Sequence, residues 1–412
     1  MISPTAVRAG MHPLSWLEEH ADQPLTACGT SIRTRRLDDA VEHIWRLRHR
    51  IGISRVSDIT ELDTVGVPVV SATRPNARKR QITVCQGKGT VHLEALASAL
   101  FEAVERHAAS EAHPTLSATP GELERSGRRF TGPGDLGLAS LPAERMEWLA
   151  ARDCRDGAEV WIPAAEALFP YEAPPGHVRP VRPSTTGLAS GSTLAEAALH
   201  AIFEVVERDA TSRFRRTGRG RLVPLGTIDD GLARNLLTRL GRAGLDTLVV
   251  DLTPTTVFPT FAVYLSDPHR WQPHLAVAGH GAHLDPSVAL RRALAEAVQS
   301  RAAAIQGSRE DLERNADVYR ADPAAQRTVF LRRALHVRAQ GVTSFSAMRA
   351  AGAASMREAL EQTARLLERH GYGTVLLTDL THPDIDVPVV HVSIPGLVDS
   401  FVDPQRKRDA DE

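Results

Sequence analysis

The sequence predicts a mixed α/β (α+β) fold in which strand–helix units recur within one chain. Three stretches place apolar residues at helical spacing, and each carries an acidic residue followed three positions later by Glu or Gln. These stretches are 97–108, 194–210 and 290–302. Short β-branched runs bounded by turn residues precede the first and third stretches, as expected for strands. Asp58 lies 44 residues before Glu102, and Asp251 lies 45 before Glu296, so the arrangement repeats.

The repeats define the expected domain organisation. We expect a variable amino-terminal arm over 1–30, one catalytic domain over 31–400 and a disordered, charged tail over 401–412. Internal repeats fall around 52–108, 187–305 and 371–396. A D-x-T triplet followed by a Pro that heads an apolar run marks a copy at Asp58, Asp251 and Asp379, and the last copy ends without a helix of its own.

The elements of the amino-terminal half follow from local patterns. Amphipathic spacing over Leu37–Ile51 predicts a surface helix, and the runs Val56–Thr60 and Val67–Ala72 predict two strands around a turn. Residues 110–150 are rich in Gly, Pro and Ser, so we expect an irregular segment with a short helix over Pro142–Ala151. A further strand is expected over Glu159–Pro163.

The central helix opens at a small-residue turn, where Ser192 or Thr193 can cap it. Its polar residues Glu196, His200, Glu204 and Glu207 are separated by four, four and three positions, so they form one stripe. Like charges at this spacing destabilise a helix unless cations compensate. One such stripe can be a solvated, salt-bridged face, but the same pattern on three helices favours a shared site.

Composition excludes several classes of protein. The chain has 412 residues, 42% of them hydrophobic and 24% charged, with a net charge of −1, which gives no general attraction for nucleic acid or an anionic membrane. No apolar run of 18 residues and no charged-then-apolar leader occurs, so we expect a cytoplasmic protein. Three widely spaced cysteines, without CxxC or HExxH, argue against a disulfide scaffold or a structural zinc site.

The acidic helix faces predict a magnesium and phosphate site. Hard divalent cations, Mg²⁺ above all, take carboxylate oxygens and phosphate oxygens as ligands. Arg106, Arg208 and Arg292 stand beside the acids and suit bidentate phosphate contact. Lys88 lies between two glycines ahead of a helix; this segment lacks the Walker spacing, and it is either an anion-binding loop or a simple turn.

Several blocks of the sequence resemble the signature segments of the YcaO superfamily. The resemblance runs in order over about residues 50–398. Its blocks read GKGTVHLEALASALFEAVER, GLASGSTLAEAALHAIFEVVERDA, GAHLDPSVALRRALAEAVQSR and VPVVHVSIPGLV. The resemblance implies a YcaO-type ATP-binding fold, with acidic helices around one nucleotide pocket. It also implies ATP- and Mg²⁺-dependent phosphorylation of backbone amides in a ribosomally made peptide, as an enzyme of peptide natural-product biosynthesis.

The resemblance assigns roles residue by residue. The metal ligands it implies are Glu102, Glu105, Glu196, Glu204, Glu207 and Glu296. Glu204, Glu207 and Arg292 are the expected catalytic residues. Further residues expected to bind the cofactor are Lys88, Ser98, Arg106, Ser192, Arg208 and Gln299, beside Glu102, Glu105, Glu196 and Glu296. Ser192 departs from the Asn that the family usually has there, and Arg33 is the candidate for the family's amino-terminal basic residue.

Two further departures bear on the reaction. The chain ends FVDPQRKRDADE instead of the Pro-rich tail of many azoline-forming members, and it shows no fused leader-binding extension. We therefore expect a stand-alone member that acts on a precursor peptide with a separate leader-binding or TfuA-like partner, with a homodimer as the default oligomeric state. Thioamide or amidine formation is favoured, with azoline formation on Cys, Ser or Thr as the alternative.

Three readings of other classes stay open. The chain can be a nucleotide-binding accessory subunit without turnover of its own, or the acidic faces can be only salt-bridged surface. The third is an RNA-binding module that uses the five arginines of 213–221. Because only one aromatic residue lies among them, a solvated loop is the simpler interpretation of this run.

Overall fold

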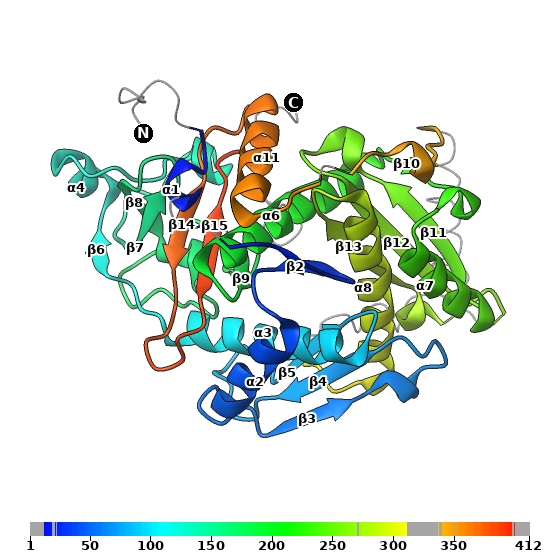
Figure 1. Cartoon of the computed structure of the whole chain (residues 1–412). Coiled ribbons are helices and arrows are strands. Elements are labelled where there is room, and N and C mark those ends of the chain that lie inside the picture. The colour runs from blue at the N-terminus through cyan, green and yellow to red at the C-terminus, as the bar shows by residue number, and fades with distance from the viewer. Residues whose placement is uncertain are drawn as a thin grey trace.

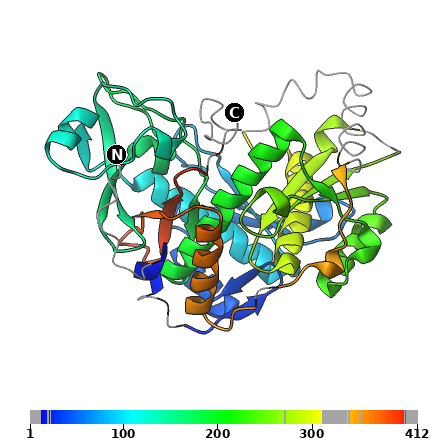
Figure 2. The same ribbon diagram turned by 90° about the horizontal axis from the view of Figure 1, so that it is seen from above.

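The computed structural model describes residues 12–18, 21, 23–269, 272–310, 337, 340–350, 352–397 and 399. Three antiparallel sheets each carry one long helix, and these helices meet at the centre of the molecule (Figure 1). In the view from above, the central helix lies between the sheet of the 116–163 region and the yellow-green sheet of the 246–282 region (Figure 2). No helix among the described residues is long and apolar enough to cross a membrane.

The first unit has the predicted order of strand, strand, strand and acidic helix. Its sheet runs β3-β4-β5 and packs against α3. The bounds are β3 (Arg55–Asp58), β4 (Val69–Thr73), β5 (Val84–Lys88) and α3 (His92–Glu111). Both strands predicted around the turn are confirmed, with ends shifted by one or two residues.

The second unit repeats this order. Its sheet runs β10-β11-β12-β13, and α8 packs against β13. The bounds are β10 (Arg221–Leu222), α7 (Gly231–Arg242), β11 (Asp246–Asp251), β12 (Thr260–Ser266), β13 (Val277–Ala282) and α8 (Pro286–Gln306). Asp285 caps α8 by accepting a hydrogen bond from the backbone of Ser287.

The third unit is assembled from two distant parts of the chain. The last repeat copy supplies β14 (Leu376–Asp379) and β15 (Val389–Ser393), and β15 pairs with β9 (Leu188–Ser190). The central helix α6 (Leu194–Thr217) follows β9 and packs against this sheet. The last copy has no helix after its strands in the sequence. In the structure α6, from an earlier part of the chain, packs on its sheet in that place.

Glycines let the helices approach their sheets closely. A Cβ atom on Gly87 of β5 would lie 2.1 Å from the carbonyl oxygen of Ala95 in α3. A Cβ on Gly279 of β13 would lie 2.1 Å from the backbone nitrogen of Ala297 in α8. Such contacts exclude any side chain at these strand positions.

The third sheet is completed by β6 (Leu116–Ala118), β7 (Met146–Asp153) and β8 (Glu159–Pro163).

The helix expected over Pro142–Ala151 is wrong, because β7 occupies Met146–Asp153. β7 pairs with β8 along one edge and with β6 and β14 along the other, and these ladder bonds override the local helical preference. The expected strand over Glu159–Pro163 is confirmed as β8. The segment 110–150 also contains α4 (Pro120–Arg125), which a Thr119 capping box opens.

The amino-terminal segment packs onto the body of the protein. Leu14 and Leu17 are fully buried in the core cluster around α6, and α1 (Ser15–Glu18) contacts α11 (Met356–Arg369). The two-stranded hairpin of β1 (Thr26–Cys28) and β2 (Ser31–Arg33) follows. The predicted boundary at residue 30 thus falls inside the turn of this hairpin. The expected tail over 401–412 lies outside the described residues.

The remaining helices connect the units. The surface helix expected over Leu37–Ile51 is present as α2 (Leu37–Leu47), which ends four residues earlier. It packs on α3 through Val41 and Ile44. The short helix α5 (Ala164–Ala167) follows β8 and contacts β7 and β15.

Candidate active site

One cavity lies where α3, α6, α8 and the β1–β2 hairpin meet. Its volume is about 420 Å³, within the size range of small-molecule sites. Eleven of the residues predicted from the sequence line it. They are Lys88, Ser98, Glu102, Glu105, Arg106, Glu204, Glu207, Arg208, Arg292, Glu296 and Gln299. Residues as far apart in the sequence as Lys88 and Gln299 therefore share one site.

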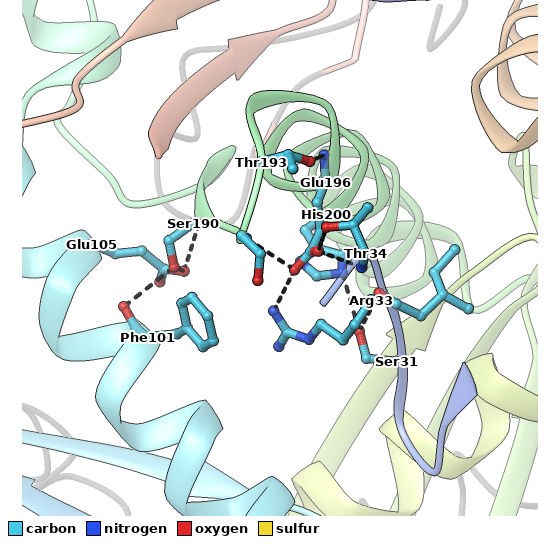
Figure 3. A network of polar contacts seen from close by, with 11 residues as sticks. Ser31, Arg33, Thr34, Phe101, Glu105, Ser190, Thr193, Glu196 and His200 are labelled. Carbon is cyan, nitrogen blue, oxygen red and sulfur yellow. Dashed lines mark hydrogen bonds and ion pairs between the residues drawn. The ribbon is translucent and has the colours of Figure 1, made fainter. Parts of the chain in front are cut away.

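The first acidic helix presents two carboxylates that are held in different ways. Glu102 accepts a hydrogen bond from the backbone N–H of Gln86 at 2.8 Å and forms an ion pair with Arg106 at 3.2 Å. Glu105 accepts from the backbone N–H of Ser190 at 2.8 Å and from the Ser190 hydroxyl at 2.7 Å, both on Oε1. Figure 3 shows this contact between α3 and the strand that leads into α6. Both bonds fall on Oε1, so within the described part of the chain Oε2 of Glu105 can take another ligand.

The other two helices add three more carboxylates with their cations. On α6, Arg208 lies 3.6 Å from Glu204 and 4.0 Å from Glu207. On α8, Glu296 receives the Lys88 ammonium at 2.6 Å. The position is equivalent to that of Glu102: Glu296 also accepts from a backbone N–H of its own sheet, that of His280 at 3.3 Å. The first and second units therefore share this hydrogen bond between a strand N–H and a helix carboxylate as well as their order of elements.

Crowding of these acids shifts their ionisation. Burial, with nearby Glu102 and Glu204, raises the pKa of Glu105 to about 8 despite the hydrogen bonds from Ser190. Burial and Glu207 raise the pKa of Glu204 to about 7 despite Arg208. Burial would also raise the pKa of Glu296, but Lys88 and His280 outweigh it and hold that pKa well below its usual value. Glu105 and Glu204 thus lack a sufficient positive partner.

Glu196 and Ser192 are the two predicted site residues that do not line the cavity. Glu196 is fully buried, and its carboxylate accepts hydrogen bonds from Arg33 Nη1 at 2.8 Å and from the Thr34 backbone and hydroxyl at 2.8 and 2.7 Å. The backbone N–H of Ser192 donates a further hydrogen bond of 3.2 Å to Glu196 Oε1. In this arrangement Glu196 holds the end of β2, and metal ligation by Glu196 and Ser192 stays a prediction.

The donor set of the cavity fits a magnesium–nucleotide complex. Buried Nε atoms of Arg33 and Arg292 have no hydrogen-bond partner among the described residues, so two guanidinium groups at the cavity have capacity for an anion. Within the part of the chain that the structure describes, no group of three or more His, Cys, Asp or Glu side chains is arranged to hold a metal ion by itself. Mg²⁺ commonly takes one or two carboxylates and completes its shell with phosphate oxygens and water, which matches this distribution.

Several lining residues were not predicted. Leu37, Phe101 and Leu188 give one part of the cavity an apolar character, and the Arg33 guanidinium lies 4.6 Å from the Phe101 ring centre. His200 also lines the cavity. Its position in the α6 stripe with Glu204 and Glu207 could have indicated that it lies at the site. The apolar residues belong to no sequence pattern that would indicate this.

Two other predicted features have structural explanations. Gly87 and Gly89 flank Lys88 because α3 leaves no space for side chains there, and the Lys88 ammonium is paired with Glu296. In the arginine run, Arg213 lies 3.8 Å from Asp209 and Arg221 binds Asp251 at 2.7 Å. Part of that run therefore stabilises the fold locally.

Comparisons with known proteins agree with this geometry. A protein of Methanothermobacter thermautotrophicus without an assigned function is 37% identical over 361 residues, covering 86% of this chain and 92% of its own length. A Rhizobium leguminosarum protein encoded in the tfuA 3′ region is 33% identical, covering 84% of each chain. The structure of YcaO from Methanopyrus kandleri bound with AMPPCP and Mg²⁺ has the same fold, with a TM-score of 0.73 at 23% identity, covering 94% of this chain and 98% of that one.

The family's sequence model covers most of the chain. It matches residues 86–398, which include α3, α6 and α8 and every carboxylate of the cavity. The description of that model is a cyclodehydratase that binds ATP and Mg²⁺. The chain belongs to the YcaO family, and ATP and Mg²⁺ are its cofactors.

Proposed function

We propose that the protein activates backbone amides of a ribosomally made peptide by phosphorylating the amide oxygen, and that its product is a thioamide or an amidine. The observation that carries this proposal is the meeting of carboxylates from three helices with the unpaired Arg292 Nε in one cavity. Acid clusters that hold Mg²⁺, with arginines and lysines on phosphates, are the working parts of phosphoryl-transfer sites.

Each group in the cavity has a role in this proposal. The side chains of Glu102, Glu105, Glu204, Glu207 and Glu296 would hold Mg²⁺, and ATP would supply the phosphoryl group. Arg208 and Arg292 would bind phosphate oxygens and stabilise the charge that develops during transfer. Among these, Glu204, Glu207 and Arg292 are the proposed catalytic residues. Lys88 would remain bound to Glu296 or move to a phosphate when the nucleotide enters.

The reaction has a fixed balance of atoms. The nucleophile forms a bond to the amide carbon, and the amide oxygen takes the phosphoryl group. The carbon–oxygen bond then breaks, and the oxygen leaves as part of inorganic phosphate. A sulfur donor at the oxidation level of sulfide gives a thioamide, and an amine gives an amidine; in both cases the nucleophile loses its protons to solvent or a base.

A separate partner is part of the proposal. The relative encoded in the tfuA 3′ region supports a TfuA-like protein as that partner. A leader-binding protein in the same role is the alternative. Azoline formation on Cys, Ser or Thr is the second candidate reaction, since the family model is described as a cyclodehydratase. The alternative of another class is a non-catalytic accessory subunit, in which the cavity would bind the nucleotide without turning over ATP.

The direct test is co-expression of the protein with a precursor peptide and a partner encoded beside it. Peptide mass spectrometry would show a gain of about 16 mass units for exchange of oxygen by sulfur, and a loss of about 18 for ring closure with loss of water, either by Cys, Ser or Thr to an azoline or by an amine of the peptide to an amidine. Glu204→Gln should abolish either change, whereas Glu111→Gln, at the far end of α3, should not. An unmodified peptide with ATP binding retained would favour the accessory role.

A further inference from the structure

The β1–β2 hairpin is a wall of the cavity that no sheet supports. Its strands pair only with each other among the described residues, through a turn at Gly29 and Thr30. Thr30, Ser31 and Arg33 nevertheless line the cavity. A lone two-stranded hairpin is marginally stable in water, so contacts with other elements must fix its position.

Glu94 supplies one such contact at the turn. Its Oε1 accepts the backbone N–H of Gly29 at 2.5 Å, while Oε2 accepts the Thr90 backbone N–H at 2.8 Å and the Thr90 hydroxyl at 2.9 Å. The residue is only 9% exposed. A Cβ atom on Gly29 would lie 2.2 Å from the Thr90 hydroxyl and 2.7 Å from Glu94 Oε1. The turn is therefore pressed against the start of α3, and a larger residue at position 29 would have to displace the Thr90 and Glu94 side chains.

Glu196 holds the opposite end of the hairpin from α6. It binds Arg33 and Thr34, and His200 on the same helix lies 3.1 Å from the Ser31 hydroxyl (Figure 3). Glu94 stands eight residues before Glu102, as Glu196 stands eight before Glu204. Glu94 of α3 and Glu196 of α6 thus occupy equivalent helix positions and accept hydrogen bonds from the two ends of the hairpin.

We propose that Glu94 is a positioning residue that latches the hairpin turn to α3 and thereby sets the affinity of the cavity for the nucleotide. Glu94 itself borders the cavity, but its two carboxylate oxygens are bonded to Gly29 and Thr90. It would therefore act through the hairpin residues Thr30 and Ser31, which follow the turn and line the cavity. Arg33, at the far end of β2, stays bonded to Glu196, so loss of the latch should loosen the turn more than the Arg33 end of the hairpin. The inference rests on nucleotide binding in this cavity.

The test uses two variants that break the same contact from opposite sides. Glu94→Ala removes the acceptor, and Gly29→Ala pushes the turn away from Thr90. Each should weaken binding of AMPPNP with Mg²⁺ in calorimetry by about tenfold, the effect of losing one charge-assisted hydrogen bond, and the double variant should lose little more. Glu94→Gln keeps one acceptor oxygen and should recover part of the affinity. Glu111→Ala, on the same helix, is the matched control.

A second measurement separates a latch from a general loss of stability. Hydrogen exchange of the amides of 26–34 should speed up in Glu94→Ala and Gly29→Ala without nucleotide, while amides in the middle of α3 keep their protection. Unchanged exchange in the hairpin, or faster exchange with unchanged nucleotide affinity, would overturn the inference. A wild-type protein that binds no nucleotide would instead contradict the proposed function. The exchange result would still decide whether Glu94 holds the hairpin.

Discussion

Binding of a magnesium–nucleotide complex should release protons from the cavity. Glu105 and Glu204 have pKa values raised to about 8 and about 7, because burial and neighbouring carboxylates disfavour their charged forms. A carboxylate must be deprotonated to bind a metal ion. At pH 7 these groups together hold about 1.4 protons, and at pH 9 they hold about 0.1. Affinity should therefore rise between pH 6 and pH 8.5 and then level off.

Calorimetry in buffers of different ionisation enthalpy measures this release directly. The slope of the observed enthalpy against the buffer enthalpy gives the number of protons released at each pH. Glu105→Gln removes the larger contribution, so the wild type should release about 0.9 protons more than this variant at pH 7. The comparison also subtracts the protons that come from the nucleotide itself. Equal release by both proteins, or release that does not fall toward pH 9, would refute the assignment of the raised pKa values.

Three further outcomes are expected. Arg292→Ala should weaken nucleotide binding in calorimetry about tenfold or more, because it removes a cavity-lining guanidinium whose Nε has no hydrogen-bond partner among the described residues; unchanged affinity would contradict its phosphate role. Gly279→Ala should lower the free energy of unfolding by about 1–3 kcal/mol in urea denaturation, since its Cβ would meet α8, and normal stability would disprove the close contact. Asp153→Asn should cost about 2 kcal/mol at pH 7 through weaker bonds from Arg129 and Arg155. These arginines outweigh burial and lower the Asp153 pKa in the folded protein. The stability that the charged Asp153 contributes is lost as pH falls from about 4 through this lowered pKa, so the difference in stability between Asp153→Asn and the wild type should shrink over that range.

Local patterns predicted the repeated units because each unit depends on short-range features. Periodicity along α3, α6 and α8 and the β-branched runs ahead of two of them are properties of neighbouring residues. The same reasoning placed Glu102 and Glu296 in equivalent positions, and both accept a backbone N–H from their own sheet. Pairing of β15 with β9 could not be predicted, because it joins segments two hundred residues apart.

The differences between the sequence-based expectations and the structure have tertiary causes. A helix is expected over Pro142–Ala151, but ladder bonds on both edges make Met146–Asp153 the strand β7. Glu196 belongs to the same helical stripe as Glu204, and only the path of the amino-terminal hairpin decides that Arg33 and Thr34 surround it. Periodicity assigns a residue to a helix face. It does not determine which distant segment lies opposite that face.

The most direct test is a crystal structure with AMPPCP in which Mn²⁺ replaces Mg²⁺. Anomalous scattering from manganese should place the metal between the triphosphate and the carboxylates of α3, α6 and α8, with Arg208 and Arg292 on phosphate oxygens. Manganese and nucleotide found outside the cavity, or metal bound without any of these carboxylates, would contradict the account.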